Sequence, residues 1–290
     1  MGVGRGLAVA IAAVLGMSVM GCAPDDGDDA GVEVVAGFYP LAWVAERIGG
    51  DRVNVTDLTP AGAEPHDLEL TTRQVDDVLD AEVVVVLGDG FQPAVEDAAA
   101  RRDGPPVEVL EKLPADALAE GDPHVWLDPV LMQDVVRAIE DALVSADPDH
   151  ESAFRRNADA LRGQLRALDE TYRAGLATCQ RDLVVTAHDA FGYLTDRYGL
   201  RNEGVAGLSP DAEPDARRLA ELADLARDEG VTTVFTEELL SPEIAETLAR
   251  EAGGLRTEVL SPLESRSDRG SYLAVMEDNL AKIRAALGCS

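Results

Sequence analysis

The sequence predicts an α/β protein with two βα lobes joined by a long rigid linker helix. Short β-branched runs alternate with helical patterns in residues 32–110 and again from residue 182 onward. Between these regions, residues 129–178 show helical spacing and no strand pattern. The run "EVVVVLG" at 82–88 has a continuous series of β-branched residues, so both faces of the strand are apolar. This pattern is typical of a parallel sheet covered by helices on both sides.

The first βα region is expected to contain strands and helices in alternation. The helix at 40–50 is closed by glycines, and the helix at 71–81 begins with threonines that can cap it. The expected strands are residues 32–36, 53–58, 82–88 and 106–110.

The middle region predicts two helices. The first covers 129–146, with Asp128 as its cap and Pro129 in its first turn, and "DPD" at 147–149 ends it. The second covers about 150–177 and is long for a globular helix, so we expect it to connect the two lobes. Trp126, just before the first helix, is expected to be a packing residue.

The second βα region repeats the rhythm of the first without an obvious sequence repeat. Strands are expected at 182–188, 231–237 and 255–260, and helices at 190–199, 213–230, 241–254 and 272–288. The resulting organisation is a signal peptide at 1–22, a disordered tether at 23–31, an N-terminal lobe at 32–147, a linking helix at 148–178 and a C-terminal lobe at 179–290.

The N-terminal 22 residues, "MGVGRGLAVAIAAVLGMSVMGC", indicate export. Their ending "VMGC" resembles the lipobox of bacterial lipoproteins, which implies lipidation at Cys22; a simple membrane anchor is the alternative. The acidic segment that follows has nothing to bury. We therefore expect an extracytoplasmic protein, held by lipid to the outer face of the cell membrane.

Charge and cysteine content narrow the possible functions further. The formal net charge is −30, which excludes nucleic-acid binding through an extended basic surface. If Cys22 is lipidated, Cys179 and Cys289 remain, and an even pair in an oxidising compartment predicts a disulfide bond. Two buried free thiols are the alternative.

Three of the four histidines indicate a metal site. In open α/β sheets, ligands bind beyond the carboxyl ends of the strands, and His66, His124 and His188 lie in loops that can meet there. A neighbouring carboxylate can accept the second ring N–H of a ligating imidazole. The acids beside the three histidines are Asp67, Asp122 and Asp189.

Imidazole nitrogens favour zinc, with copper or nickel as less available alternatives. The fourth histidine, His150, lies at the start of the long helix with no strand before it. We expect His150 to be exposed to solvent and to have no role in the site.

The motifs around these histidines resemble those of a known family. "PAGAEPHDLELT", "DPHVWLDP" and "TAHDAFGYL" occur in the order seen in the zinc-binding substrate-binding lipoproteins of metal ABC transporters, the ZnuA-like group (cluster A-I) of the TroA superfamily, and "VFTEELLSPEIAETLAREAG" matches as well. The resemblance implies a non-enzymatic, monomeric protein that binds Zn²⁺ in the cleft between two lobes. It implies His66, His124 and His188 as ligands, with an ABC permease and its ATPase as partners for zinc uptake.

The sequence departs from the family pattern at the fourth ligand. Ser261 stands where many relatives have an aspartate, and a neutral hydroxyl is a poor zinc ligand. The fourth ligand is then water or a nearby carboxylate, from Glu64, Glu264 or Asp268.

Other functions on the same scaffold stay open at this stage. Manganese-binding relatives tend to have a glutamate at the position of His188 and manganese prefers oxygen ligands, so the third imidazole favours zinc. A cell-adhesion lipoprotein that need not bind metal tightly is a second alternative. A zinc hydrolase is a third, although the sequence has no HExxH motif.

Overall fold

The computed structural model describes residues 1–4, 31–209 and 216–290. The expected lipidation site Cys22, most of the expected signal peptide and the tether up to Ala30 lie outside the described residues. None of the helices in the described residues is long and apolar enough to cross a membrane.

The first sheet is parallel, with strand order β2-β1-β3-β4. All four valines of β3 are buried, and they alternate between two hydrophobic clusters on opposite faces of the sheet, as expected for a doubly covered strand. The strands are β1 (Val32–Ala36), β2 (Val53–Asp57), β3 (Val83–Val86) and β4 (Val107–Glu108). The helices are α1 (Tyr39–Gly49), α2 (Thr72–Asp80), α3 (Pro93–Ala99) and α4 (Val109–Lys112).

The second sheet is also parallel and has the equivalent order, β6-β5-β7-β8. The two sheets confirm the expected two-lobed α/β fold. The strands are β5 (Leu183–Thr186), β6 (Arg201–Gly204), β7 (Thr233–Thr236) and β8 (Arg256–Val259). The helices are α7 (Gly192–Arg197), α8 (Ala216–Asp228) and α9 (Glu243–Glu251).

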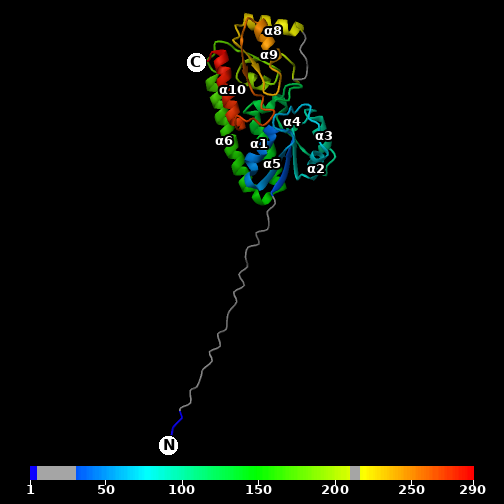
Figure 1. Ribbon diagram of the computed structural model, residues 1–290, viewed down its shortest axis with the longest axis vertical. Coiled ribbons are helices and arrows are strands. Elements are labelled where there is room, and N and C mark those ends of the chain that lie inside the picture. The colour runs from blue at the N-terminus through cyan, green and yellow to red at the C-terminus, as the bar shows by residue number, and fades with distance from the viewer. Residues whose placement is uncertain (5–30, 210–215) are drawn as a thin grey trace. The chain divides into compact units, whose positions relative to one another are not determined.

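Three long helices flank the sheets: α5 (Leu131–Ala146), α6 (Glu151–Gly175) and α10 (Tyr272–Leu287). Helix α6 has 25 residues, and its apolar residues at helical spacing, including Phe154, Leu165 and Tyr172, are buried. It runs beside α10 (Figure 1). The Tyr172 hydroxyl donates to the Met276 carbonyl at 2.6 Å. The long helix is therefore a packed part of the core as well as a connection.

Short 3-10 helices complete the chain, and some boundaries differ from expectation. They are η1 (Gly50–Arg52), η2 (Ala115–Ala117), η3 (Val125–Leu127) and η4 (Pro148–His150). Helix α5 begins at Leu131 and not at residue 129, because residues 125–127 form η3 first. Asp128 therefore does not cap α5; its carboxylate accepts the Val130 N–H at 2.8 Å and pairs with Arg197.

Strand β6 was not expected from the sequence, and strand β4 differs from its expected length. Strand β6 has the polar sequence "RNEG" at the edge of its sheet, where only Gly204 is buried. Strand β4 is shorter than expected, because the backbone turns into α4 at Val109. Both strands lie at the edge of their sheets and are stabilised by pairing with one neighbouring strand, β3 for β4 and β5 for β6. An edge strand does not need apolar residues on both faces.

Cys179 and Cys289 form the expected disulfide bond, with an S–S distance of 2.03 Å. The Ser290 N–H also donates to the Thr178 carbonyl at 3.1 Å. The bond ties the segment after α6 to the segment after α10, and it rules out the alternative of two free thiols in this structure.

Candidate metal site

Four side chains converge on one point: His66, His124, His188 and Glu264. Each offers one ligand atom, and these atoms lie within 4.8 Å of one another. His66 lies between β2 and α2, His124 directly precedes η3, His188 follows β5 and Glu264 follows β8. The three histidines singled out in the sequence thus come together, and of the three candidate carboxylates Glu264 joins them.

A single carboxylate oxygen faces all three imidazoles. Oε1 of Glu264 lies 3.5 Å from Nε2 of His66, 3.5 Å from Nε2 of His124 and 3.4 Å from Nε2 of His188. Within the described part of the chain, Oε1 of Glu264 and Nε2 of His66 are buried without a hydrogen-bond partner. Buried polar atoms of this kind are costly unless something binds them. Three nitrogens and one oxygen form a ligand set suited to tetrahedral zinc.

His66 is held by the loop around it and by the segment after β3. Its ring packs edge-on against Phe91 at 4.6 Å between centroids. Its backbone N–H donates to Oε1 of Glu64 at 2.9 Å. The buried Gln92 side chain donates to the carbonyls of Gly37 and Pro65, which fixes the loop that carries His66. Sequence reasoning did not identify the roles of Phe91 and Gln92.

Asp122 orients His124, as the sequence predicted. Its Oδ1 lies 2.7 Å from Nδ1 of the ring and accepts the His124 backbone N–H at 3.0 Å. With Nδ1 occupied, Nε2 is directed into the cluster. Trp126 packs at 5.1 Å from the His124 ring, and its indole N–H donates to the Pro262 carbonyl at 2.7 Å. Trp126 is therefore a packing residue that also ties the "DPHVWLDP" loop to the segment carrying Glu264.

The prediction that Asp67 and Asp189 are the carboxylate partners of His66 and His188 was wrong. Nδ1 of His188 lies 2.7 Å from Glu237, which directly follows β7, whereas Asp189 accepts the Gly204 backbone N–H and the Asn202 amide. Asp67 is exposed. The sequence signal that could have identified Glu237 is its place directly after a buried strand, β7. This strand pairs with β5, and β5 ends just before His188.

Of the other candidates, Glu64 borders the cluster, with its Oε1 4.0 Å from Nε2 of His66, whereas Ser261 and Asp268 are not among the four converging side chains. Ser261 is buried, but its Oγ accepts the Leu263 N–H at 3.3 Å. Asp268 is exposed at the surface. The side chain of His150 is 27% exposed, so it is partly buried and less exposed than expected; its Nδ1 pairs with Asp147 at 2.6 Å, outside the cluster.

Neighbouring carboxylates raise the pKa of two of the imidazoles, those of His124 and His188. Burial lowers the pKa of His188, but Glu237 and Glu264 outweigh burial and raise it to about 10. Burial likewise lowers the pKa of His124, and Asp122 and Glu264 outweigh it and raise the value. For Glu264, burial raises the pKa, but the three imidazoles hold it well below its usual range. Burial and the charge of Glu264 raise the pKa of Glu64 to about 7.

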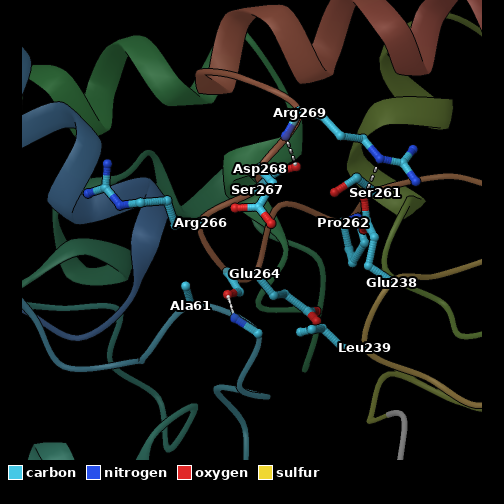
Figure 2. Close-up of a pocket in the computed structure, with 12 residues that line it drawn as sticks. Ala61, Glu238, Leu239, Ser261, Pro262, Glu264, Arg266, Ser267, Asp268 and Arg269 are labelled. Carbon is cyan, nitrogen blue, oxygen red and sulfur yellow. Dashed lines mark hydrogen bonds and ion pairs between the residues drawn. The ribbon is translucent and has the colours of Figure 1, made fainter.

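Solvent approaches the cluster from two sides. A cavity of ≈ 470 Å³ is lined by Glu264 and the residues that follow it, with Ala61 from the facing loop (Figure 2). A second hollow of ≈ 310 Å³ is lined by His66, Phe91 and Pro123. The His66 side chain is 12% exposed, whereas those of His124, His188 and Glu264 are at most 1% exposed. His66 is thus the most accessible of the four.

The architecture and the cluster agree with one family. The family model described as ZnuA, "Zinc-uptake complex component A periplasmic", matches residues 34–286. The chain belongs to the ZnuA family. The resemblance noted in the sequence motifs is thereby confirmed.

Two curated relatives illustrate the match. The chain is 34% identical over 302 residues to the high-affinity zinc uptake system protein ZnuA of Bacillus subtilis, covering 96% of this chain and 93% of the relative. It is 33% identical over 302 residues to the zinc-binding lipoprotein AdcA of Streptococcus pneumoniae, covering 96% of this chain. The chain spans 60% of the length of that AdcA. The names of both relatives describe zinc-binding or zinc-uptake proteins and not enzymes.

Solved structures show the same fold. The laminin-binding protein Lmb of Streptococcus agalactiae, described as having adhesin and metal-transporting activity, superposes with a TM-score of 0.82 at 30% identity, covering 89% of this chain and 100% of Lmb. The Zn(II)-bound ZnuA-like domain of Streptococcus pneumoniae AdcA gives a TM-score of 0.76 at 34% identity, covering 89% and 99%.

Proposed function

We propose that this protein captures Zn²⁺ outside the cytoplasm and delivers it to an ABC permease for zinc uptake, with His66, His124, His188 and Glu264 as the zinc ligands. The observation that carries the proposal is the cluster itself, in which three imidazole nitrogens and one carboxylate oxygen lie within 4.8 Å of one another. Membership of the ZnuA family supports the transport role.

The composition of the cluster favours zinc over manganese. Three of its four ligand atoms are imidazole nitrogens, and manganese prefers oxygen ligands. Zinc is commonly tetrahedral with nitrogen, sulfur and oxygen ligands, so it matches both the number and the type of the atoms present.

The partners and location follow from the same proposal. The permease receives the metal and its ATPase drives the transport, and lipid at Cys22 holds the protein, as a monomer, at the outer face of the membrane. The lipobox-like "VMGC" and relatives named as lipoproteins support the anchor.

The decisive experiment is a competitive zinc titration of the chain from Ala23 onward. Wild type, His124→Ala and His150→Ala are compared, with manganese titrated in parallel. We expect one tightly bound zinc, weak manganese binding, a loss of at least about a hundredfold in zinc affinity for His124→Ala, and no change for His150→Ala. Zinc binding that is indifferent to His124 would refute the proposed ligand set.

Adhesion is a second candidate function, favoured by the structural match to Lmb. Binding of the purified protein to immobilised laminin, with and without zinc, tests it. Absence of saturable binding at micromolar concentrations would remove this candidate and leave zinc capture unaffected.

A further inference from the structure

We propose that Asn279, on helix α10, is a positioning residue that holds Glu264 in the metal site. The inference rests on the proposed function, because it assigns Glu264 as the fourth zinc ligand. The buried side-chain amide of Asn279 acts on Glu264 through the three residues that precede Glu264, which are Ser261, Pro262 and Leu263.

The Asn279 side chain brackets the backbone of Ser261. Its Oδ1 accepts the Ser261 N–H at 3.0 Å, and its Nδ2 donates to the Ser261 carbonyl at 2.7 Å. Asn279 is 1% exposed and lies on the buried face of α10 with Val275, Met276 and Ile283. A carboxamide is costly at such a position unless it is hydrogen-bonded. Both bonds reach the main chain, so the restraint depends on Asn279 and not on the side chain at position 261.

These two hydrogen bonds, called the Asn279 bracket below, hold the start of a turn with an unfavourable backbone conformation. Leu263 has a φ of +58° and is one of two non-glycine residues with positive φ in the described residues. A leucine adopts this left-handed conformation only when its surroundings hold it there. The Ser261 Oγ accepts the Leu263 N–H, and the Trp126 indole holds the Pro262 carbonyl. The Leu263 side chain is fully buried.

Glu264 follows this turn directly, so its direction depends on the conformation of Leu263. The turn places Oε1 of Glu264 3.4–3.5 Å from three imidazoles. If the bracket is removed, Leu263 can relax towards an ordinary conformation, and the carboxylate then moves away from the imidazoles. Asn279 therefore acts on the metal through Glu264 and makes no contact with the metal itself.

The test uses the full extracytoplasmic chain with Asn279→Leu, a variant of similar size that removes both hydrogen bonds. The matched control is Leu280→Ala, which removes packing from the next buried residue of α10. Zinc affinity, the melting temperature of the metal-free protein and the visible absorption of the Co²⁺-loaded protein are measured. We expect Asn279→Leu to weaken zinc binding about tenfold to hundredfold and to shift the Co²⁺ spectrum towards that of Glu264→Ala. Leu280→Ala should lower the melting temperature and leave both readouts unchanged.

A double-mutant cycle separates positioning from general destabilisation. In a Glu264→Ala background, Asn279→Leu should cause no further loss of zinc affinity. An unchanged affinity and Co²⁺ spectrum in Asn279→Leu would overturn the inference, as would an undiminished loss in the Glu264→Ala background. If Asn279→Leu does not fold, Asn279→Asp replaces it, since it keeps the acceptor for the Ser261 N–H and loses only the donor. A wild-type protein that fails to bind zinc would instead overturn the proposed function.

Discussion

Nδ1 of His188 lies 2.7 Å from Oε2 of Glu237, and the two side chains are 0% and 2% exposed. Glu237 also accepts the His188 backbone N–H at 3.2 Å through Oε1. One carboxylate thus fixes both the backbone and the ring of His188, and it directs Nε2 towards Glu264 and the His124 ring.

Replacing Glu237 by glutamine should therefore weaken zinc binding about tenfold to hundredfold, because the imidazole loses both its orientation and its anionic partner. The neighbouring Glu238→Gln is the matched control, since the Glu238 side chain is 28% exposed. Competitive zinc titration checks both variants. Equal affinities for Glu237→Gln and wild type would show that the pair does not orient the ligand.

Zinc affinity should rise with pH well above the ordinary histidine range. The pKa of His188 in the metal-free protein is raised from 6.5 to about 10, so its imidazole is protonated at neutral pH and zinc must displace that proton. Affinity should then increase about tenfold per pH unit for each displaced proton between about pH 7 and 9. Calorimetry in buffers of different ionisation enthalpy measures the proton release. An affinity that is constant above pH 7.5 would contradict the prediction.

The same shift has a consequence for stability. Because the folded-state pKa of His188 lies above the unfolded value, its stabilising contribution is complete below pH 6.5 and is lost as pH rises towards about 10. Chemical unfolding of the metal-free protein across this range should show a declining free energy of unfolding, and Glu237→Gln should flatten the decline.

Ser265 links the two loops that carry His66 and Glu264. Its Oγ accepts the Gly62 N–H at 2.7 Å across the opening of the site. Ser265→Ala removes a bond of about 1 kcal/mol, so zinc should dissociate about fivefold faster. Ser267→Ala is the control, because the Ser267 Oγ accepts the Arg269 N–H within its own loop. Stopped-flow transfer of zinc to a chelator measures the rates; equal rates for the two variants would exclude a role for the link.

Asp57, at the end of β2, should limit stability at neutral pH. Burial raises its pKa from 3.8 to about 6, so the folded protein holds the proton more tightly and stability falls as pH rises through this range. Asp57→Asn should raise the free energy of unfolding by about 2 kcal/mol at pH 7 and change it little at pH 4. Urea unfolding at the two pH values checks this, with the exposed Asp51→Asn as control. A variant that is no more stable at pH 7 would contradict it.

The sequence predicts the elements whose signal is local. The valines of β3, the heptad-like spacing of α6 and the threonine that caps α2 each indicate their structure within a few residues. The three histidines of the cluster were singled out for the same reason, since His66 and His188 lie in segments that follow strands and His124 lies in a loop just before a helical turn. Strand β6 was missed because its polar residues pair only with β5 at the sheet edge.

The parts that were missed depend on contacts distant in sequence. Glu237 is 49 residues from His188, and strand pairing between β5 and β7 brings them together. Glu264 was one of three candidate carboxylates for the fourth ligand. The left-handed turn at Leu263 directs its side chain into the cluster. No sequence pattern indicates a leucine in that conformation, because it is imposed by Asn279 and Trp126.

The four converging side chains come in equal numbers from the two halves of the chain. His66 and His124 follow strands of the first sheet, and His188 and Glu264 follow strands of the second. A bound zinc ion would thus cross-link the lobes, adding about 4 kcal/mol to the free energy of unfolding when free zinc exceeds the dissociation constant a thousandfold. With the location proposed above, proteases outside the cell would then degrade empty molecules faster than loaded ones, so the amount of this protein would itself follow the zinc supply.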